Sequence, residues 1–494
     1  MNRQIRRLAL GLIVCYAILF LQLNNWQVAR RNELNDDPRN NRELLRDFNS
    51  PRGRIVTADD VVIAETTERD IDGNIVRQRV YPRKDLFANV TGYFTLGFGS
   101  SQLERTENDV LAGRTAEQQL QLAQHLFTNQ DVSGDVVLTM RDDIQSAARD
   151  ALGEREGSVV VLDVRTGAVL AMWSWPSYDP NYLVDRTATN TLTLFEYLNA
   201  DPRKPLLANA YQERYMPGST FKMITTATSL RASMIDLTSV WDQESSFTPP
   251  QTNDPIENYG GSTCGGDLAE VFRRSCNIPF ARMALELGAK KLVSATDAWG
   301  FGEELPFDLP RPAASVFGKV SDFDNDLPML AIQGFGQGNV QMVPLHMAMV
   351  AAAIANGGKM MTPYVVASTR DHNGAVLTST KPSLWRTPID AATANVLTDL
   401  MIEVVNSGTA SCCMQLANGI QAAAKTGTAQ LNAKGEPMRS HAWITAFAPA
   451  KTPQIAIAVM VKGVNDEVSA STGGHLAGPI AKKVLDVALR VLGS

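Results

Sequence analysis

The pattern of apolar residues divides the chain into three regions, and the first is a short hydrophobic run. Residues 8–23 are almost wholly apolar, interrupted only by Gln22, and they follow a head with three arginines. Such a run predicts a secretory signal or a short membrane span, although it is shorter than the ~20 residues that a span prefers. No Ala-x-Ala-like cleavage site follows, and Trp26 suits a membrane–water interface. We therefore predict an uncleaved signal-anchor helix within residues 1–31, with a cleaved signal peptide as the alternative.

The second region, residues 32–155, contains short strand-like runs and two helical patterns. It begins with a polar and charged stretch to about residue 50, which is typical of a linker. Runs rich in β-branched residues then predict strands, and amphipathic spacing predicts helices. The predicted strands cover residues 54–56, 61–64, 74–81 and 134–139, and the predicted helices cover residues 115–128 and 142–152. These elements predict a separate N-terminal domain.

The third region, residues 156–494, places strands at both ends of a helical middle. Two apolar strands are joined by a turn that ends in Gly167, and a helix-rich and loop-rich stretch follows from about residue 178 to 400. The predicted strands cover residues 158–162, 168–173, 422–430, 441–447 and 454–461, and a last helix covers residues 476–492. This order predicts one antiparallel sheet that the C-terminal strands complete. With helices over both faces, it is an α+β layered domain.

Composition narrows the function classes. The chain has 494 residues, of which 44% are hydrophobic and 20% charged, so it can bury a large core in more than one domain. A net charge of −6 argues against nucleic-acid binding. Five cysteines are too few for a disulfide scaffold. No zinc-ligand spacing, His-Glu-x-x-His, Walker A loop or Gly-x-Ser-x-Gly elbow is present in the sequence, so we expect no metal.

A serine followed three residues later by a lysine is the first chemical signal. Met216-Pro217-Gly218 end an extended loop, and the apolar residues that follow predict a helix with Ser219 near its N-terminus. Lys222 then lies one turn deeper on the same face. Because burial lowers the pKa of a lysine, a neutral Lys222 is able to take the proton of Ser219. Alone, the pattern more often marks a serine N-cap and an exposed lysine on an ordinary helix.

A second motif, Ser275-Cys276-Asn277, predicts a loop between helices. In such a loop Ser275 can relay a proton to a leaving amine as a general acid. Asn277 can orient Lys222 and hold the carbonyl of a substrate amide. The alternative is a plain turn, which is the default for any Ser-x-Asn sequence.

A third motif, Lys425-Thr426-Gly427-Thr428, follows three alanines and predicts a strand. The small residues and Gly427 permit close approach of another backbone, so an extended peptide can lie alongside. Lys425, Thr426 and Thr428 are then candidates to bind a terminal carboxylate. The N–H groups of Ser219 and Thr428 are candidates for an oxyanion hole. The alternative is again a simple turn.

The three motifs in this order resemble those of the serine β-lactamases and penicillin-binding proteins. The common middle motif has aspartate where this chain has Cys276. Variation at this position is usual among transpeptidases, so the departure weakens a β-lactamase interpretation rather than the resemblance itself. Further elements resemble the short actinobacterial class B penicillin-binding proteins, namely Pro51-Arg52-Gly53-Arg54-Ile55, Leu103-Glu104 with Leu111-Ala112-Gly113, Gly336-Gln337-Gly338 with Pro344-Leu345, Asp37-Pro38-Arg39-Asn40, Glu257-Asn258-Tyr259-Gly260-Gly261 and Ala442-Trp443.

The resemblance implies a fold and an activity. The fold is a serine β-lactamase/transpeptidase-like domain over residues 156–494, preceded by a pedestal or dimerisation-like domain and a membrane anchor. The activity is that of a D,D-transpeptidase that cross-links peptidoglycan stem peptides ending in D-Ala-D-Ala, in cell-wall synthesis linked to division and cell shape. Ser219 forms the acyl-enzyme, β-lactams acylate the same serine, and no cofactor takes part.

The resemblance also implies a location and partners. The family consists of single-pass proteins of the cell membrane whose catalytic domain is extracytoplasmic. Its members work with a glycosyltransferase and with divisome proteins, and nothing implies a nucleic-acid partner. Two other functions remain open, namely a serine β-lactamase or β-lactam sensor, and a non-enzymatic divisome scaffold. The large N-terminal region argues against the first, and the intact motifs argue against the second.

The cysteines and histidines carry weaker signals. Cys264 and Cys276 are twelve residues apart in an oxidising compartment, and we hypothesise a disulfide beside the second motif, with two reduced thiols as the equal alternative. Adjacent cysteines seldom pair, so we expect Cys412 and Cys413 to be a strained or free thiol pair on a loop. His441 and His475 are interpreted as structural, as is the glycine-rich turn at residues 334–338.

Overall fold

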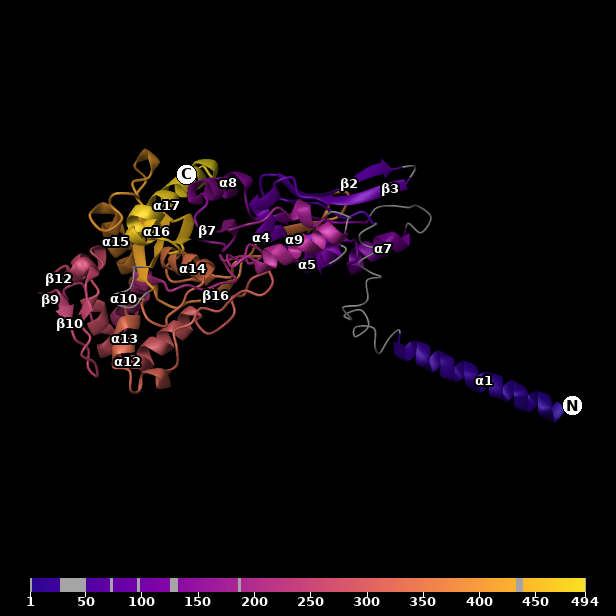
Figure 1. The fold of residues 1–494 in the computed structure, drawn as a ribbon, viewed down its shortest axis with the longest axis horizontal. Helices are drawn as coiled ribbons and strands as arrows, with labels where there is room; N and C mark the ends of the chain where they lie inside the picture. Colours follow the sequence, from indigo (N-terminus) through magenta and orange to yellow (C-terminus); the bar gives the residue numbers. More distant parts are fainter. Residues whose placement is uncertain are drawn as a thin grey trace.

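The computed structural model describes residues 2–26, 50–71, 74–95, 98–124, 132–184, 188–431 and 439–493. The expected linker at residues 32–49, which includes the Asp37–Asn40 element, lies outside these ranges. So does the end of the helix expected over residues 115–128. Figure 1 shows an isolated N-terminal helix, a region of strands and short helices, and a larger region built around a central sheet.

Helix α1 (Asn2–Asn24) contains the N-terminal apolar run. Within the described ranges it is the one helix long and apolar enough to cross a membrane, and none of its apolar window is buried by protein. An N-terminal helix of this kind is also what a signal sequence forms. The retained anchor therefore stays a prediction, and the cleaved signal stays its alternative.

The central sheet has the strand order β17-β18-β19-β7-β8, and each neighbouring pair is antiparallel. Its strands are β7 (Gly157–Asp163), β8 (Val169–Trp175), β17 (Ala423–Gln430), β18 (Ser440–Ala448) and β19 (Ile455–Val461). Every residue of β18 and β19 is buried, as expected for strands covered on both faces. The predicted sheet, completed by C-terminal strands, is confirmed. Strand β17 lies at its edge and carries the third motif.

Helices cover the two faces of this sheet (Figure 1). Helices α8 (Asp142–Leu152) and α17 (Gly473–Val491) pack together on one face, and the apolar stripe of α17 recurs every three or four residues. Helix α14 (Pro344–Ala355) packs on the other face, and its first eleven residues are all buried. It is almost wholly apolar because the central sheet lies on one side of it and α15 (Ala391–Asn406) packs against it. Helix α10 (Lys222–Arg231) packs in turn against α15 and α12 (Ile278–Trp299).

A second sheet forms the N-terminal region, in the order β15-β14-β6-β1-β2-β3. Its strands are β1 (Ile55–Val56), β2 (Val62–Ile71), β3 (Asn74–Val80), β6 (Asp135–Leu138), β14 (Val366–Arg370) and β15 (Val376–Ser379). The last two come from the middle of the third region; β14 pairs with β6, and β15 pairs with β14. This sheet therefore joins residues on both sides of the expected boundary at residue 155, and the three domain ranges stay predictions.

Shorter elements complete the described fold. Helices include α4 (Ala88–Thr91), α5 (Gln102–Thr106), α6 (Asn108–Leu111), α7 (Ala116–Gln124), α9 (Ala188–Ala200), α11 (Leu268–Arg273), α13 (Leu327–Gln333) and α16 (Asp466–Ala470). Short strands include β4 (Phe94–Thr95), β5 (Gly99–Ser100), β9 (Val240–Glu244), β10 (Ser246–Phe247), β11 (Ile256–Glu257), β12 (Cys264–Asp267), β13 (Met360–Met361) and β16 (Leu384–Arg386).

A buried ionic network accounts for two sequence elements of the N-terminal region. Arg52 and Arg79 each donate to the Glu104 carboxylate at 2.7 Å, and all three side chains are almost fully buried. Burial alone raises the pKa of Glu104, but the charges of Arg79 and Arg52 outweigh it and hold the pKa below its usual value. The Pro51–Ile55 and Leu103-Glu104 elements thus meet in one buried network of the N-terminal region.

Candidate active site

The Ser219 turn lies against the edge strand of the central sheet. Residues Gly218–Phe221 form a 3₁₀ turn (η4), and α10 follows directly. Gly218 has φ +56°, and a Cβ atom there would come within 2.8 Å of the Thr428 backbone. Trp443 donates from Nε1 to the Met216 carbonyl at 3.0 Å and so fixes the approach to the turn. The half-buried Ser219 hydroxyl has no hydrogen-bond partner among the described residues.

Lys222 is fully buried beneath this turn. Its Nζ donates to the carbonyls of Ser275 and Cys276 at 2.7 Å each, and to Asn277 Oδ1 at 2.9 Å. The Phe280 ring lies 5.1 Å away. Burial, with the nearby charge of Lys425, holds the pKa of Lys222 well below its usual 10.5.

The hydrogen-bond acceptors around Lys222 favour its charged form, whereas burial favours its neutral form. Three acceptor atoms require three N–H donors, which only an ammonium group supplies. A neutral Lys222 has two N–H groups and one lone pair, so it cannot serve all three acceptors. When Lys222 accepts a proton, it must therefore first release one of them.

Ser275 joins the two motif lysines. Its Oγ accepts from Lys425 Nζ at 2.8 Å and lies 3.3 Å from Lys222 Nζ. Ser275 has φ +61°, a left-handed conformation that is costly for a residue other than glycine and that marks a constrained position. The contacts make a continuous path from Lys222 through the Ser275 hydroxyl to Lys425, along which a proton can travel.

The third motif divides its side chains between two sides of β17. Lys425 points to Ser275, and burial lowers its pKa to about 7. A Cβ atom at Gly427 would come within 2.7 Å of the Pro217 carbonyl, so only glycine lets the turn and the strand approach this closely. Thr426 and Thr428 lie on the side of β17 opposite to Lys425, because successive residues of a strand face opposite sides. The Thr428 hydroxyl accepts from the Gly473 N–H at the start of α17, at 3.2 Å.

Three hydrogen bonds of the site were not predicted from the sequence. Thr409, from the loop after α15, shares a 2.6 Å hydrogen bond between hydroxyls with Thr426. Gln337 donates to the Thr428 carbonyl at 3.3 Å, and Gly218 donates its N–H to the Gly336 carbonyl at 2.9 Å. The glycine-rich turn, which the sequence analysis interpreted as merely structural, therefore packs against both the nucleophile turn and β17.

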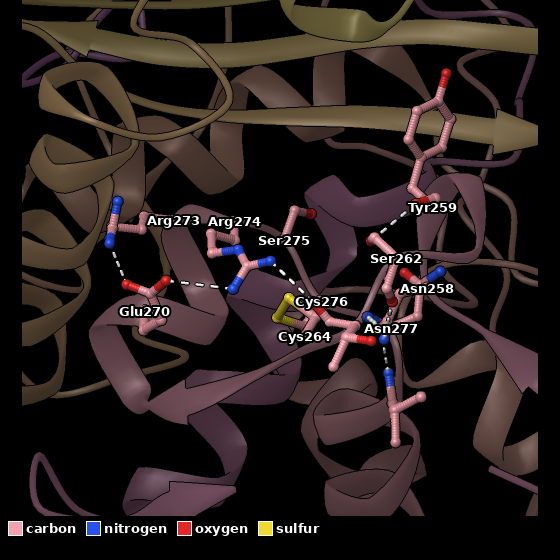
Figure 2. The surroundings of a disulfide bond; sticks show 12 residues. Asn258, Tyr259, Ser262, Cys264, Glu270, Arg273, Arg274, Ser275, Cys276 and Asn277 are labelled. Atoms are coloured by element: carbon pink, nitrogen blue, oxygen red, sulfur yellow. Dashed lines mark hydrogen bonds and ion pairs between the residues drawn. A yellow bond between two sulfur atoms is a disulfide. The ribbon is translucent and has the colours of Figure 1, made fainter. Parts of the chain in front are cut away.

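The second motif is also held by a disulfide and by ion pairs of the helix that precedes it. Figure 2 shows a disulfide between Cys264, on β12, and Cys276 in the motif. Glu270 on α11 forms ion pairs with Arg273 and Arg274, just before the motif. These contacts place Cys276, whose carbonyl accepts from Lys222, on a covalently closed loop.

Loss of the Cys264–Cys276 bridge is expected to destabilise the protein. A closed loop of this size contributes about 3 kcal/mol to the free energy of unfolding. Cys264→Ser should lower the denaturant midpoint accordingly, while Cys15→Ser, which alters a free cysteine of α1, should leave it unchanged. Alkylation of the native, unreduced protein followed by mass spectrometry checks the bridge itself. Two alkylatable thiols at positions 264 and 276 would contradict it.

The other candidates lie outside this cluster. Cys412 and Cys413 form a disulfide in the structure, so the expectation of free thiols is wrong there. Their Cα atoms are 3.8 Å apart, closer than in most disulfides, which is why sequence alone argues against such pairs. His441 is buried and accepts from the Gly463 N–H, and His475 contacts Thr472, as expected for structural histidines. In the described part of the chain, no group of three or more potential ligands is placed to hold a metal ion.

The structure thus brings the three motifs together from a helix start, a loop and an edge strand. The lysines and Ser275 are in contact, Asn277 contacts Lys222, and Gly427 and Thr428 lie against the Ser219 turn. Thr426 lies on the side that faces Thr409. Such an arrangement can activate a serine, relay its proton and hold an extended peptide along β17.

Comparison with known proteins gives matches over nearly the whole chain. A family model described as the penicillin binding protein transpeptidase domain matches residues 157–486. A second, described as the penicillin binding protein A dimerisation domain, matches residues 52–137. The chain is 37% identical over 502 residues to peptidoglycan D,D-transpeptidase PbpA of Mycolicibacterium smegmatis, covering 99% of each chain. It is 36% identical over 505 residues to PbpA of Mycobacterium tuberculosis, again covering 99% of each.

Solved structures agree with these matches. The imipenem acyl-enzyme complex of penicillin-binding protein A from M. tuberculosis has a TM-score of 0.81 at 34% identity, covering 90% of this chain and 100% of that one. Its penicillin G acyl-enzyme complex also has a TM-score of 0.81 at 34% identity, covering 89% and 100%. The transpeptidase-like fold with a pedestal domain, predicted from the sequence, is confirmed.

Proposed function

Because the chain belongs to the penicillin-binding protein transpeptidases, we propose that it is a peptidoglycan D,D-transpeptidase with Ser219 as its nucleophile. The observation that carries the proposal is the buried contact chain from Lys222 through Ser275 to Lys425, directly beneath the Ser219 turn. Relatives named D,D-transpeptidases and acyl-enzyme complexes of a similar protein support it.

Acylation begins with attack of Ser219 Oγ on the carbonyl carbon of the penultimate D-Ala. Lys222, in its neutral form, accepts the hydroxyl proton. The N–H groups of Ser219 and Thr428 stabilise the negative charge that develops on the carbonyl oxygen. The C–N bond then breaks, the proton passes through Ser275 to the leaving amine, and D-Ala departs with a neutral amino group. An ester between Ser219 and the stem peptide remains.

Deacylation completes the transfer. The amine of a neighbouring stem peptide attacks the ester carbonyl, loses its proton to the same relay, and releases the Ser219 hydroxyl. A new peptide bond now joins the two strands, and no cofactor takes part. A β-lactam acylates Ser219 in the same way, but its leaving amine stays tethered after the ring opens.

Substrate binding is assigned to β17 and the second motif. Lys425, Thr426 and Thr428 bind the terminal carboxylate of the donor peptide, and Gly427 lets the peptide backbone approach the strand. Asn277 holds the amide carbonyl of the substrate from the opposite side. The Thr409–Thr426 pair contains two hydroxyl protons and needs only one for its own bond, so the other is available to an incoming carboxylate.

The location and partners follow from the family. We propose that α1 anchors the chain in the cell membrane, that residues 32–155 form a pedestal, and that residues 156–494 act on the extracytoplasmic side. The same proposal includes a glycosyltransferase that makes the glycan strands and divisome proteins that place the enzyme. The apolar, uncovered α1 supports the anchor.

A donor peptide ending in D-Ala-D-Ala tests the proposed reaction. We expect D-Ala release together with a cross-linked product when an acceptor amine is present, measured by chromatography and mass spectrometry. The amount of cross-linked product should rise with acceptor concentration, because amine and water compete for the same ester. Hydrolysis alone at every acceptor concentration would contradict a transpeptidase, and no release of D-Ala would favour a scaffold.

A further inference from the structure

Asn258 makes four hydrogen bonds beside the second motif, although no chemical role was predicted for it. Its side chain is 3% exposed. Oδ1 accepts from the N–H groups of Asn277 and Ile278, at 2.8 and 3.3 Å. Nδ2 donates to the carbonyls of Glu244 and Ser262, at 2.8 and 3.1 Å. Figure 2 shows Asn258 next to Asn277, on the side away from Ser275.

The two accepted bonds cap a helix. Asn277 is the N-cap residue of α12 and Ile278 is its first residue, and N–H groups at this position have no partner within the helix. An N-cap side chain usually bonds the N–H of the second or third residue of its helix, but the second residue of α12 is Pro279, which has no N–H. Asn277 makes no capping bond with its side chain. Asn258, nineteen residues earlier in the chain, instead binds the N–H groups of Asn277 and Ile278.

The Asn277 side chain faces the site. Its Oδ1 accepts from Lys222 at 2.9 Å, and its Nδ2 donates to the Glu257 carbonyl at 3.0 Å. The Asn258 oxygen holds the backbone N–H groups of Asn277 and of the next residue, so it fixes the backbone from which the Asn277 amide reaches Lys222. Without Asn258, these two N–H groups lose their side-chain acceptor.

Asn258 is held by elements that are fixed independently. Asn258 contacts the carbonyl of Glu244, which is the last residue of β9. Strand β9 pairs with β12, and Glu244 lies opposite Cys264 in this pairing. The Glu244 carboxylate forms an ion pair of 2.7 Å with Arg282 on α12. The disulfide then joins Cys264 to Cys276. The motif is thus held on either side of Cys276, by a covalent bond and by the Asn258 amide.

We propose that Asn258 is a positioning residue of the transpeptidase site, which binds the backbone N–H groups of Asn277 and Ile278 and so keeps the Asn277 amide turned to Lys222. The inference rests on the proposed function of Ser219 and Lys222. Asn258 does not touch the reacting atoms in this account. It acts through the orientation of Asn277.

The test compares acylation kinetics of two variants in the full chain. Asn258→Leu is close in shape but removes all four bonds, whereas Asn258→Asp keeps the oxygen that accepts from Asn277 and Ile278 and loses the two bonds that Nδ2 donates. We expect Asn258→Leu to lower the first-order acylation constant with a fluorescent penicillin about 10- to 100-fold, the cost of misplacing one catalytic group. Asn258→Asp should lose less of this constant, because its oxygen still holds the two N–H groups at the start of α12. Its melting temperature should fall, because its second oxygen faces the Glu244 and Ser262 carbonyls.

The readout separates positioning from loss of folded protein. A folding defect reduces the final amount of labelled protein, whereas a positioning defect reduces the rate constant at full final labelling. Asn181→Leu is the matched control, because the Asn181 amide also bridges backbone and side-chain groups, at Tyr81 of the N-terminal region and at Asp179. It should lower the melting temperature without changing the acylation constant.

An unchanged acylation constant in Asn258→Leu would overturn the inference, as would equal losses in Asn258→Leu and Asn258→Asp. An equal loss in Asn181→Leu would do the same, because the effect would then be general destabilisation. In all three cases wild-type acylation of Ser219 leaves the proposed function standing. If the wild-type protein forms no Ser219 adduct, the proposed function fails, and this inference falls with it.

Discussion

Replacing Ser219 with alanine is expected to abolish covalent labelling by penicillin. Removal of the nucleophile from a serine enzyme costs roughly six orders of magnitude in rate, since no other group can form the acyl intermediate. The remaining site, with its lysines and edge strand, is not disturbed by the loss of a half-buried hydroxyl that has no hydrogen-bond partner among the described residues. Gel fluorescence after incubation with a fluorescent penicillin measures the effect.

Ser229→Ala is the matched control for this variant. Ser229 lies on α10 with Lys222, and its buried hydroxyl has no hydrogen-bond partner within the described residues. Labelling of Ser229→Ala by the fluorescent penicillin should equal that of the wild type. Labelling that survives in Ser219→Ala would place the nucleophile elsewhere and refute the proposed chemistry.

Replacing Lys222 with methionine is expected to lower the acylation rate by about two to four orders of magnitude, the usual contribution of a general base. Methionine fills a similar volume, so the loss reports on the amine rather than on a cavity. Lys222→Arg should be similarly impaired, because a guanidinium keeps the charge but does not release its proton. If Lys222→Arg retained activity, Lys222 would act through its charge alone. Lys482→Met, on the surface side of α17, controls for loss of a lysine.

The pH dependence of acylation provides a second readout of Lys222. The neutral amine is the base, so the rate should rise as pH rises through the lowered pKa of Lys222, and Lys222→Met should lose this limb. Lys425 binds the substrate carboxylate as a cation, and its pKa is about 7, so the second-order acylation constant should fall as pH rises through about 7. A bound substrate carboxylate favours the charged form of Lys425 and so raises its pKa. The first-order acylation constant refers to the enzyme with bound substrate, so it should fall only at a higher pH.

Short motifs and periodic patterns predicted most of the catalytic frame. Ser219, Lys222 and Gly427 were recognisable because chemistry and close backbone approach restrict the residue type at each position. Strands β7, β8, β18 and β19 of the central sheet were recognisable because burial on both faces leaves largely apolar runs. Strand β17 was predicted instead from the alanines before the third motif. The motif order then sufficed to place a helix start, a loop and an edge strand around one site.

Contacts between distant polar groups could not be predicted in this way. Asn258 and Thr409 act through hydrogen bonds to other segments, and neither bond leaves a periodic pattern in the sequence. The hairpin of β14 and β15 joins the N-terminal sheet across more than two hundred residues, a pairing that local propensity does not encode. The Cys412–Cys413 disulfide could not be predicted from the sequence, because adjacent cysteines seldom pair.

The central claim, a stable acyl-enzyme on Ser219, is tested most directly by intact-protein mass spectrometry after mixing with penicillin G. The account predicts a mass increase of one whole penicillin, because ring opening expels no atoms, that persists and maps to the peptide containing Ser219. Consumption of the antibiotic without a lasting adduct would contradict the account in favour of a β-lactamase. Intact antibiotic with unmodified protein would contradict it in favour of a scaffold.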